Sequence, residues 1–169
     1  MTEPYAFTPD DSPLLAKLRN VLHQRANTRS PYLPPLPNAS LVTSHVIPTL
    51  DMSAPSLERP IQEFLAALEE PYRSRVRPAP LFASSVSLDQ AEDCLGSWLV
   101  GGLAYDVAIF DDDPNAGWDF IAELLVSLDT PPSTRFYTAD HVFETSEEQR
   151  ALFIVSAERL TMILVFGTD

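Results

Sequence analysis

The chain has 169 residues, of which 45% are hydrophobic and 21% are charged, a composition typical of globular proteins. This length supports one hydrophobic core, and two complete domains would be cramped, so we expect a single domain over residues 1–169. Cys94 is the only cysteine, which excludes an intramolecular disulfide and a zinc site built from several thiolates.

The net charge of −13 is distributed unevenly along the sequence. Residues 1–85 contain eight basic and eight acidic residues, whereas residues 86–169 contain three arginines against sixteen acidic residues. The second half of the chain therefore carries the whole excess of acidic over basic residues. A field of this sign disfavours nucleic acids and anionic membranes and favours cations or a basic protein surface. An acidic composition also promotes solubility without any binding role, and this simpler interpretation stays open.

Neither a membrane span nor a secretion signal is predicted. No apolar run approaches about 18 residues, and the first residues show no basic segment followed by an apolar one. We therefore expect no membrane partner and a cytoplasmic location. The single lysine and the sixteen prolines suggest a bacterial coding style.

The first half of the chain alternates helices with proline-rich connections. Residues 1–11 are predicted to be loosely held, and a helix over residues 13–26 follows Ser12 as N-cap and Pro13 as first helical residue. Residues 27–40 contain four prolines and predict an extended connection. The β-branched residues in 41–47 predict a strand that ends at Pro48. A second helix is expected from Pro60 to residue 70.

A basic cluster and a short capped helix come next. Residues 72–77 hold three arginines and a tyrosine, which we interpret as a solvated connection that pairs with the acidic half. Residues 80–86 predict a short strand. Ser87 and Gln90 form a capping-box pattern for a helix over residues 88–95, ended by Gly96.

The segment from Trp98 to Phe110 predicts the central strand of the sheet. Both of its alternating faces are largely apolar, as in a strand covered on both sides, and Asp106 is the exception. Three aspartates at positions 111–113 follow, and Pro114 then begins an amphipathic helix that stops at Asp129.

Strands dominate the remainder. Residues 135–143 predict a strand, 144–150 a polar loop, and 151–155 with 160–166 a hairpin. We therefore predict an α+β fold, with a mixed, largely antiparallel sheet, helices packed on it and a C-terminal β-hairpin. Because both faces of this hairpin are apolar, an uncovered edge would also favour a homodimer through it.

The acidic turn is the sharpest candidate for chemistry. Carboxylates at a strand end hold Mg²⁺ or Ca²⁺ in metal-dependent hydrolases, with Asp106, Asp119 or Glu123 as further ligands. Successive side chains alternate in direction, however, so only Asp111 and Asp113 would converge. The favoured interpretation is that one aspartate caps the following helix and the others face its positive end.

Other catalytic arrangements find little support, and we predict no cofactor. His23, His45 and His141 lie far apart in sequence, and Asp140 next to His141 faces the opposite way on a strand. Cys94 lies next to Glu92 and Asp93, whose charges oppose a reactive thiolate, and is predicted to be buried and inert. The sequence therefore favours a non-enzymatic protein.

A binding role requires no reactive group. We predict an acidic surface that contacts a basic protein partner, as in immunity-type proteins that neutralise a toxin. The core of this predicted surface comprises Asp111, Asp112, Asp113, Trp118, Asp119 and Glu123. Further carboxylates and aromatic anchors are expected from Asp129, Glu144, Glu147, Glu148, Tyr137 and Phe143. A structural or dimerising domain is the remaining alternative.

Overall fold

An antiparallel sheet organises the protein. The computed structural model describes residues 8–9, 12–18, 40–46, 50–68, 70, 72–77, 83–100, 113–128, 134–144 and 148–167. Six strands pair in the order β1-β2-β6-β5-β4-β3, and every pairing is antiparallel. The strands are β1 (Thr8–Pro9), β2 (Ser40–Val46), β3 (Ala83–Val86), β4 (Arg135–Asp140), β5 (Glu148–Val155) and β6 (Arg159–Gly167).

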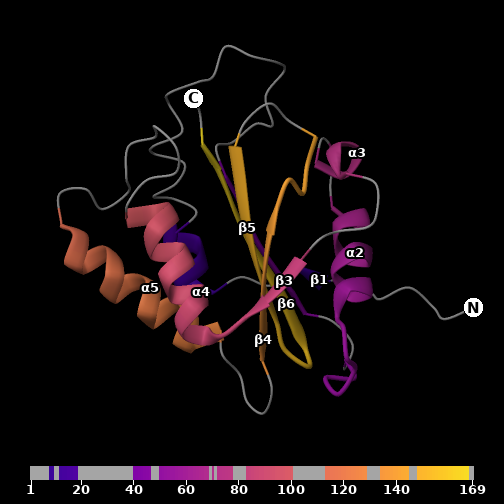
Figure 1. Ribbon diagram of the computed structural model, residues 1–169, viewed down its shortest axis with the longest axis horizontal. Coiled ribbons are helices and arrows are strands. Elements are labelled where there is room, and N and C mark those ends of the chain that lie inside the picture. Colours follow the sequence, from indigo (N-terminus) through magenta and orange to yellow (C-terminus); the bar gives the residue numbers. More distant parts are fainter. Residues whose placement is uncertain are drawn as a thin grey trace, which may run out of the picture.

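Helices cover both faces of this sheet (Figure 1). One face carries α2 (Glu58–Ala66) and the short α3 (Tyr72–Arg75). The other carries the helical residues 13–18, α4 (Leu88–Leu95) and α5 (Pro114–Leu128). A π-helical turn, η1 (Gly96–Val100), continues from α4. The predicted α+β class, with helices on a largely antiparallel sheet and a C-terminal hairpin, is confirmed.

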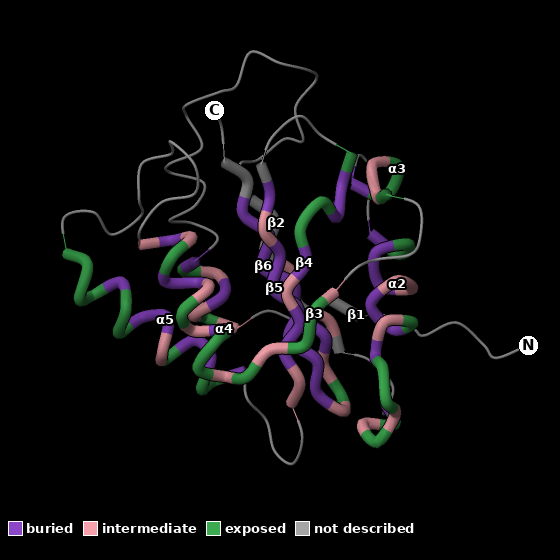
Figure 2. Tube along the Cα trace, viewed as in Figure 1, coloured by how far each residue is buried: buried purple, intermediate pink, exposed green. Residues whose placement is uncertain are grey.

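The hairpin of β5 and β6 forms the centre of the molecule. Because side chains alternate along a strand, β5 directs Ala151, Phe153 and Val155 towards α2, and Leu152 with Ile154 towards α5. All five are at most 2% exposed (Figure 2). Burying one such large side chain stabilises the fold by roughly 1.5–3 kcal/mol. Two hydrophobic cores, one on each face, therefore share the same two strands.

One buried polar residue holds the end of this sheet. The Gln149 side chain is fully buried, and its amide oxygen accepts from the Phe143 backbone N–H at 2.8 Å. Its amide nitrogen donates to the Phe143 carbonyl oxygen, also at 2.8 Å. The backbone pairing of β4 ends at Asp140, and the chain turns at His141, which has a φ of 57°. Beyond this turn, the Gln149 side chain makes the hydrogen bonds to Phe143 that a neighbouring strand would otherwise make. The segment 142–144 is fixed as a result.

Local signals in the sequence located several elements correctly. Ser87 and Gln90 make both bonds of the predicted capping box, and α4 occupies residues 88–95 as expected. The hairpin closes through the Ser156 N–H, which donates to the Arg159 carbonyl at 2.9 Å. The predicted helix over 13–26 is confirmed for residues 13–18, and its remainder lies outside the described residues, as do residues 1–7 and 27–39.

Some predicted boundaries shift. The second helix begins at Glu58, two residues before the proline taken as its start, and its α-helical part ends at Ala66. β5 begins at Glu148, inside the predicted loop, because it pairs from there with the end of β6. The capped helix meets Gly96 as expected, but this residue keeps right-handed helical angles and the chain continues into η1.

The prediction of the central strand was wrong at its start. Residues 98–100 belong to η1 and pack through Leu99 into the core beneath α5, while residues 101–112 lie outside the described part. The strands that are apolar on both faces are β5 and β6 instead. Both also have a neighbour on their outer side, β4 and β2, so the uncovered edge on which the dimer prediction rested is not present in the hairpin.

Candidate functional site

The α5 helix begins with a capping interaction from the acidic turn. Asp113 accepts a hydrogen bond from the Ala116 backbone N–H through Oδ1 at 3.2 Å, and its carbonyl accepts from the Gly117 N–H at 3.2 Å. A carboxylate at this position satisfies an unpaired N–H group and lies at the positive end of the helix dipole. The capping role predicted for one aspartate is confirmed for Asp113. Asp111 and Asp112 lie outside the described residues.

Trp118 packs α5 against the turn that follows α4. A Cβ atom built on Gly96 would lie 1.9 Å from Cη2 of the Trp118 ring. No side chain fits in that space, so glycine at position 96 allows the ring to lie directly on the backbone. The ring nevertheless stays 37% exposed, and it is one of two large hydrophobic residues exposed in the described part of the chain. The packing thus holds an aromatic side chain at the protein surface.

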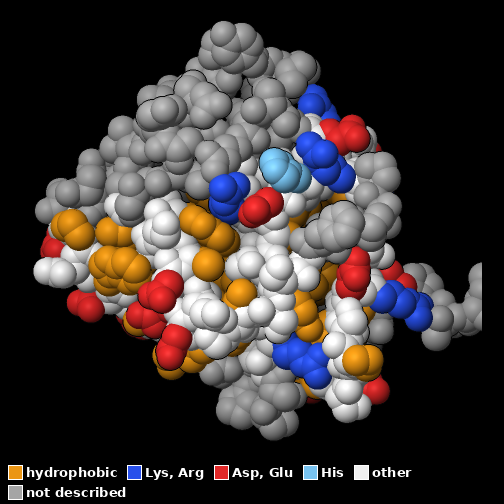
Figure 3. All heavy atoms as spheres, in the orientation of Figure 1, with side chains coloured by type: hydrophobic (Ala, Val, Ile, Leu, Met, Phe, Trp, Pro, Cys, Tyr) orange, Lys and Arg blue, Asp and Glu red, His pale blue; other side chains and the backbone are white. Residues whose placement is uncertain are grey.

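The two helices together form a carboxylate-rich surface, here called the α4–α5 face. Asp113, which precedes α5, and Asp119 and Glu123 within it are exposed. On α4, Asp89 and Asp93 are exposed and Glu92 is half-buried. Figure 3 shows acidic side chains gathered over these helices, without basic side chains among them in that view. The sequence pattern predicted Asp113, Asp119 and Glu123 as members of this surface. The α4 members were missed because only the packing of α4 against α5 joins them to it.

The electrostatic field of this face is barely compensated. None of its six carboxylates forms an ion pair with a described residue. From position 78 to 134 the sequence contains ten acidic residues and no lysine or arginine. One cation does contact α5: Nζ of Lys17 lies 5.1 Å from the centre of the Phe120 ring. The face therefore presents a strongly negative potential to an approaching molecule.

Cys94 experiences the same environment. Burial raises the pKa of its thiol, and the charges of Asp93 and Asp140 raise it further. Because the thiolate is the nucleophilic form, a raised pKa disfavours covalent chemistry at this position.

Other predicted members of the binding surface lie elsewhere. Tyr137 is 8% exposed and Phe143 is fully buried, so neither anchors a partner, and both belong to the core beneath α2. Glu144 is exposed beside α3, where its backbone pairs with Arg75. Asp106, Asp129 and Glu147 lie outside the described residues, and nothing is described of the Glu148 side chain.

The predicted metal site at the acidic turn finds no supporting cluster of ligands in the described part of the chain. Among the described residues, no group of three or more His, Cys, Asp or Glu side chains is placed to hold a metal ion. Of the proposed ligands, Asp113 caps α5, and Asp119 and Glu123 lie on the exposed side of the helix.

The two histidines in the described part of the chain lie in different elements of the fold. His45 on β2 is half-buried and contacts the Phe64 ring edge-on, with the ring centres 5.1 Å apart. His141 is exposed beyond the end of β4, and Asp140 faces Arg150 at 3.5 Å rather than an imidazole. His23 lies outside the described residues.

A concave site lies on the opposite face of the sheet. A cleft of about 420 Å³ opens between α2, α3 and the segment around Val142. The basic cluster of residues 72–77 forms one wall, through Arg73, Val76 and Arg77. The arginines were expected to pair with the acidic half, and Arg75 and Arg77 do donate to it, through the carbonyl oxygens of Glu144 and Phe143. The basic cluster was recognisable in the sequence, but the cleft was not, because its lining residues come from three separate segments of the chain.

The fold defines an α+β protein with helical layers on both faces of an antiparallel sheet. Comparison with models of known families, with curated proteins and with solved structures finds no match for this chain. In the described part of the chain, none of the helices combines the length and the apolar character needed to span a membrane. The geometry of the two sites is therefore the basis for a functional assignment.

Proposed function

We propose that the protein is a non-enzymatic binding protein whose α4–α5 face contacts a basic surface of a partner protein. One observation carries this proposal: the α4–α5 face combines six carboxylates, none ion-paired with a described residue, with a tryptophan that is 37% exposed. Complementary charge accelerates association and selects the partner, whereas a desolvated aromatic side chain supplies affinity. The combination supports a protein interface more than a surface that only maintains solubility, because solubility requires no exposed tryptophan.

The proposed partner is a protein with a cationic site, in a cytoplasmic setting. An immunity-type inhibitor, which covers the basic active site of a toxin such as a nuclease, has the physical profile of the α4–α5 face. The exposed α5 carboxylates would occupy positions that the toxin reserves for phosphate groups. Nucleic acid itself is disfavoured as a ligand of this face because phosphates and carboxylates repel each other.

The test compares variants in their capture of a partner from a lysate of the source organism. Trp118→Ala removes the proposed anchor, and the pair Asp119→Asn with Glu123→Gln removes two charges. Each is expected to weaken binding of the captured protein by roughly tenfold or more, because anchors at interfaces contribute about 2 kcal/mol or more. Affinity measured by surface plasmon resonance should also fall as salt increases.

The matched control is Glu158→Gln. Glu158 is an exposed carboxylate in the turn between β5 and β6, away from α4 and α5, so its loss should leave binding unchanged. Equal affinity of wild type and the Asp119/Glu123 variant, or binding that does not respond to salt, would contradict the proposal.

A further inference from the structure

We propose that the cleft between α2 and α3 binds a small organic carboxylate with an apolar body. This site lies on the other face of the sheet from α4 and α5 and does not depend on the function proposed above. Its volume of about 420 Å³ falls in the range of about 300–1,000 Å³ that is usual for small-molecule sites. The lining residues are Gln62, Leu65, Ala66, Arg73, Val76, Arg77 and Val142.

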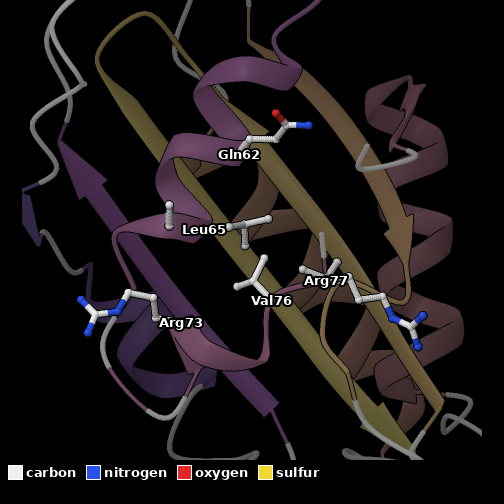
Figure 4. A pocket seen from close by; sticks show the side chains of 7 residues that line it. Gln62, Leu65, Arg73, Val76 and Arg77 are labelled. Carbon is white, nitrogen blue, oxygen red and sulfur yellow. The ribbon is translucent and has the colours of Figure 1, made fainter. Parts of the chain in front are cut away.

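The interior of the cleft is apolar. Leu65 and Val76 lie at its middle (Figure 4), and Val142 is 1% exposed. Arg73 and Arg77 contribute their aliphatic stems to the walls, while their guanidinium groups extend outward on opposite sides. Gln62 supplies a polar amide at one end. Such a lining favours a ring or a short alkyl chain and places any charged group of the ligand at the mouth.

The charge at the mouth comes mainly from Arg77. Arg73 is compensated, because its Nη2 lies 3.2 Å from Oε1 of Glu70 and its Nε donates to the same atom at 3.2 Å. Arg77 donates through Nε to the Phe143 carbonyl at 3.2 Å, and no described carboxylate pairs with its guanidinium. In a protein with a net charge of −13, a guanidinium that pairs with no described carboxylate and lies beside an apolar cleft is the feature that selects an anion.

The Arg77 side chain is also held in position. Its backbone N–H donates to the Val142 carbonyl at 2.9 Å, and the Glu144 N–H donates to the Arg75 carbonyl at 2.7 Å. With Nε occupied, the two terminal nitrogens stay directed to the outside, where a carboxylate accepts two parallel hydrogen bonds. A dianionic phosphate would meet one uncompensated guanidinium within a negative molecule. A monoanionic carboxylate therefore fits this site better.

The experiment titrates the full-length protein with three probes that share an eight-carbon chain: octanoate, octanol and octylamine. Backbone NMR shifts report where and how tightly each one binds. Octanoate is expected to bind saturably with shifts around residues 62–66, 72–77 and 142–144, and octylamine should not bind there. Octanol should bind roughly tenfold or more weakly than octanoate, because it lacks the charge-assisted contact with Arg77.

Three variants separate this site from general hydrophobic association. Arg77→Gln should weaken octanoate binding by roughly tenfold while leaving octanol binding unchanged. Ala66→Trp fills the cleft from an exposed position and should abolish binding of both probes. Arg59→Gln is the matched control, because Arg59 is an exposed arginine of α2 outside the cleft, paired with Glu63 at 3.0 Å. Circular dichroism confirms that each variant is folded.

Several outcomes would overturn the proposal. Equal binding of octanoate and octylamine, or equal losses in Arg77→Gln and Arg59→Gln, would show that Arg77 does not select an anion. Unsaturable binding or shifts spread over the whole molecule would show only surface association. Tighter binding of octyl phosphate than of octanoate would refute the carboxylate assignment.

Discussion

At the scale of single residues, His45 shows how burial adjusts chemistry without creating a catalytic site. Its imidazole packs edge-on against Phe64 beneath α2, and Nδ1 lies 3.3 Å from Oγ1 of Thr43. Burial lowers the pKa of His45 below the ordinary value of 6.5. The folded state therefore favours the neutral ring, as expected for a half-buried imidazole that packs against an aromatic ring.

This lowered pKa predicts loss of stability in mild acid. Below pH 6.5 the unfolded chain takes up a proton at His45 before the folded chain does, so protonation favours unfolding. Above pH 6.5, the contribution of His45 to the free energy of unfolding should be constant. Its contribution should become less favourable as the pH decreases from 6.5 towards the pKa of His45 in the folded state. Urea denaturation between pH 5 and pH 8 measures this change.

The control for that measurement is His45→Gln, which does not titrate. Acid destabilisation just below pH 6.5 should be smaller in this variant than in wild type, while the carboxylates, which titrate at lower pH, contribute equally to both. An identical pH dependence in the two proteins would show that His45 is not responsible.

At the scale of secondary-structure elements, Gly96 determines how α4 and α5 meet. The sequence indicated a helix end there, since glycine commonly follows the last helical residue. The structure gives a different reason for the glycine: the Trp118 ring occupies the space of a side chain at position 96. A close approach of two elements, rather than a left-handed backbone, accounts for this residue.

Gly96→Ala should therefore displace Trp118. The added Cβ would lie 1.9 to 2.6 Å from three atoms of the ring, so the ring must move outward. The expected destabilisation is about 1–3 kcal/mol, the usual cost of overpacking. Acrylamide quenching of tryptophan fluorescence in a Trp98→Phe background should increase, and chemical denaturation measures the loss in stability.

The informative control repeats the substitution in a Trp118→Ala background. Without the ring, alanine at position 96 meets no obstacle and should stabilise the helical turn by up to about 1 kcal/mol. The effect of Gly96→Ala is thus expected to change sign between the two backgrounds. Equal destabilisation in both would disprove that Trp118 is the obstacle.

At the scale of the whole molecule, charge is divided between the two helical layers. The α4–α5 face carries six carboxylates without ion pairs among the described residues. On the other face, Arg59 pairs with Glu63 within α2, and Arg73 of α3 pairs with Glu70, which precedes that helix. Repulsion among like charges on one side opposes folding. Exposed ion pairs on the other side contribute only about 0–1 kcal/mol each. The net electrostatic contribution of these surfaces is therefore unfavourable at low salt.

Sodium chloride should accordingly raise the melting temperature. Screening shortens the Debye length from about 30 Å at 0.01 M to about 10 Å at 0.1 M, which weakens repulsion across the α4–α5 face. A gain of about 1 kcal/mol corresponds to roughly 2–4 °C for a chain of this size. The Asp93→Asn and Glu123→Gln double variant should melt higher at low salt and respond less to added salt. A melting temperature that falls with salt would contradict the expected repulsion.

Local sequence determined the elements whose signals lie within a few residues. Ser87 with Gln90 located α4, Asp113 with Pro114 located the start of α5, and the apolar run on each side of residues 156–159 located the hairpin. Hydrogen bonds between near neighbours create these features, so they leave a pattern in the sequence.

Only the tertiary structure decided which apolar segment forms the centre and which side chains reach the surface. The residues beginning at Trp98 and those of the hairpin are both apolar on two faces, but pairing with β2 and β4 places the hairpin in the middle. Packing likewise buried Tyr137 and Phe143, joined α4 to α5 in one acidic face, and brought Gln62, Arg77 and Val142 together around a cleft. These outcomes depend on contacts between residues far apart in the chain, and local periodicity carries no information about such contacts.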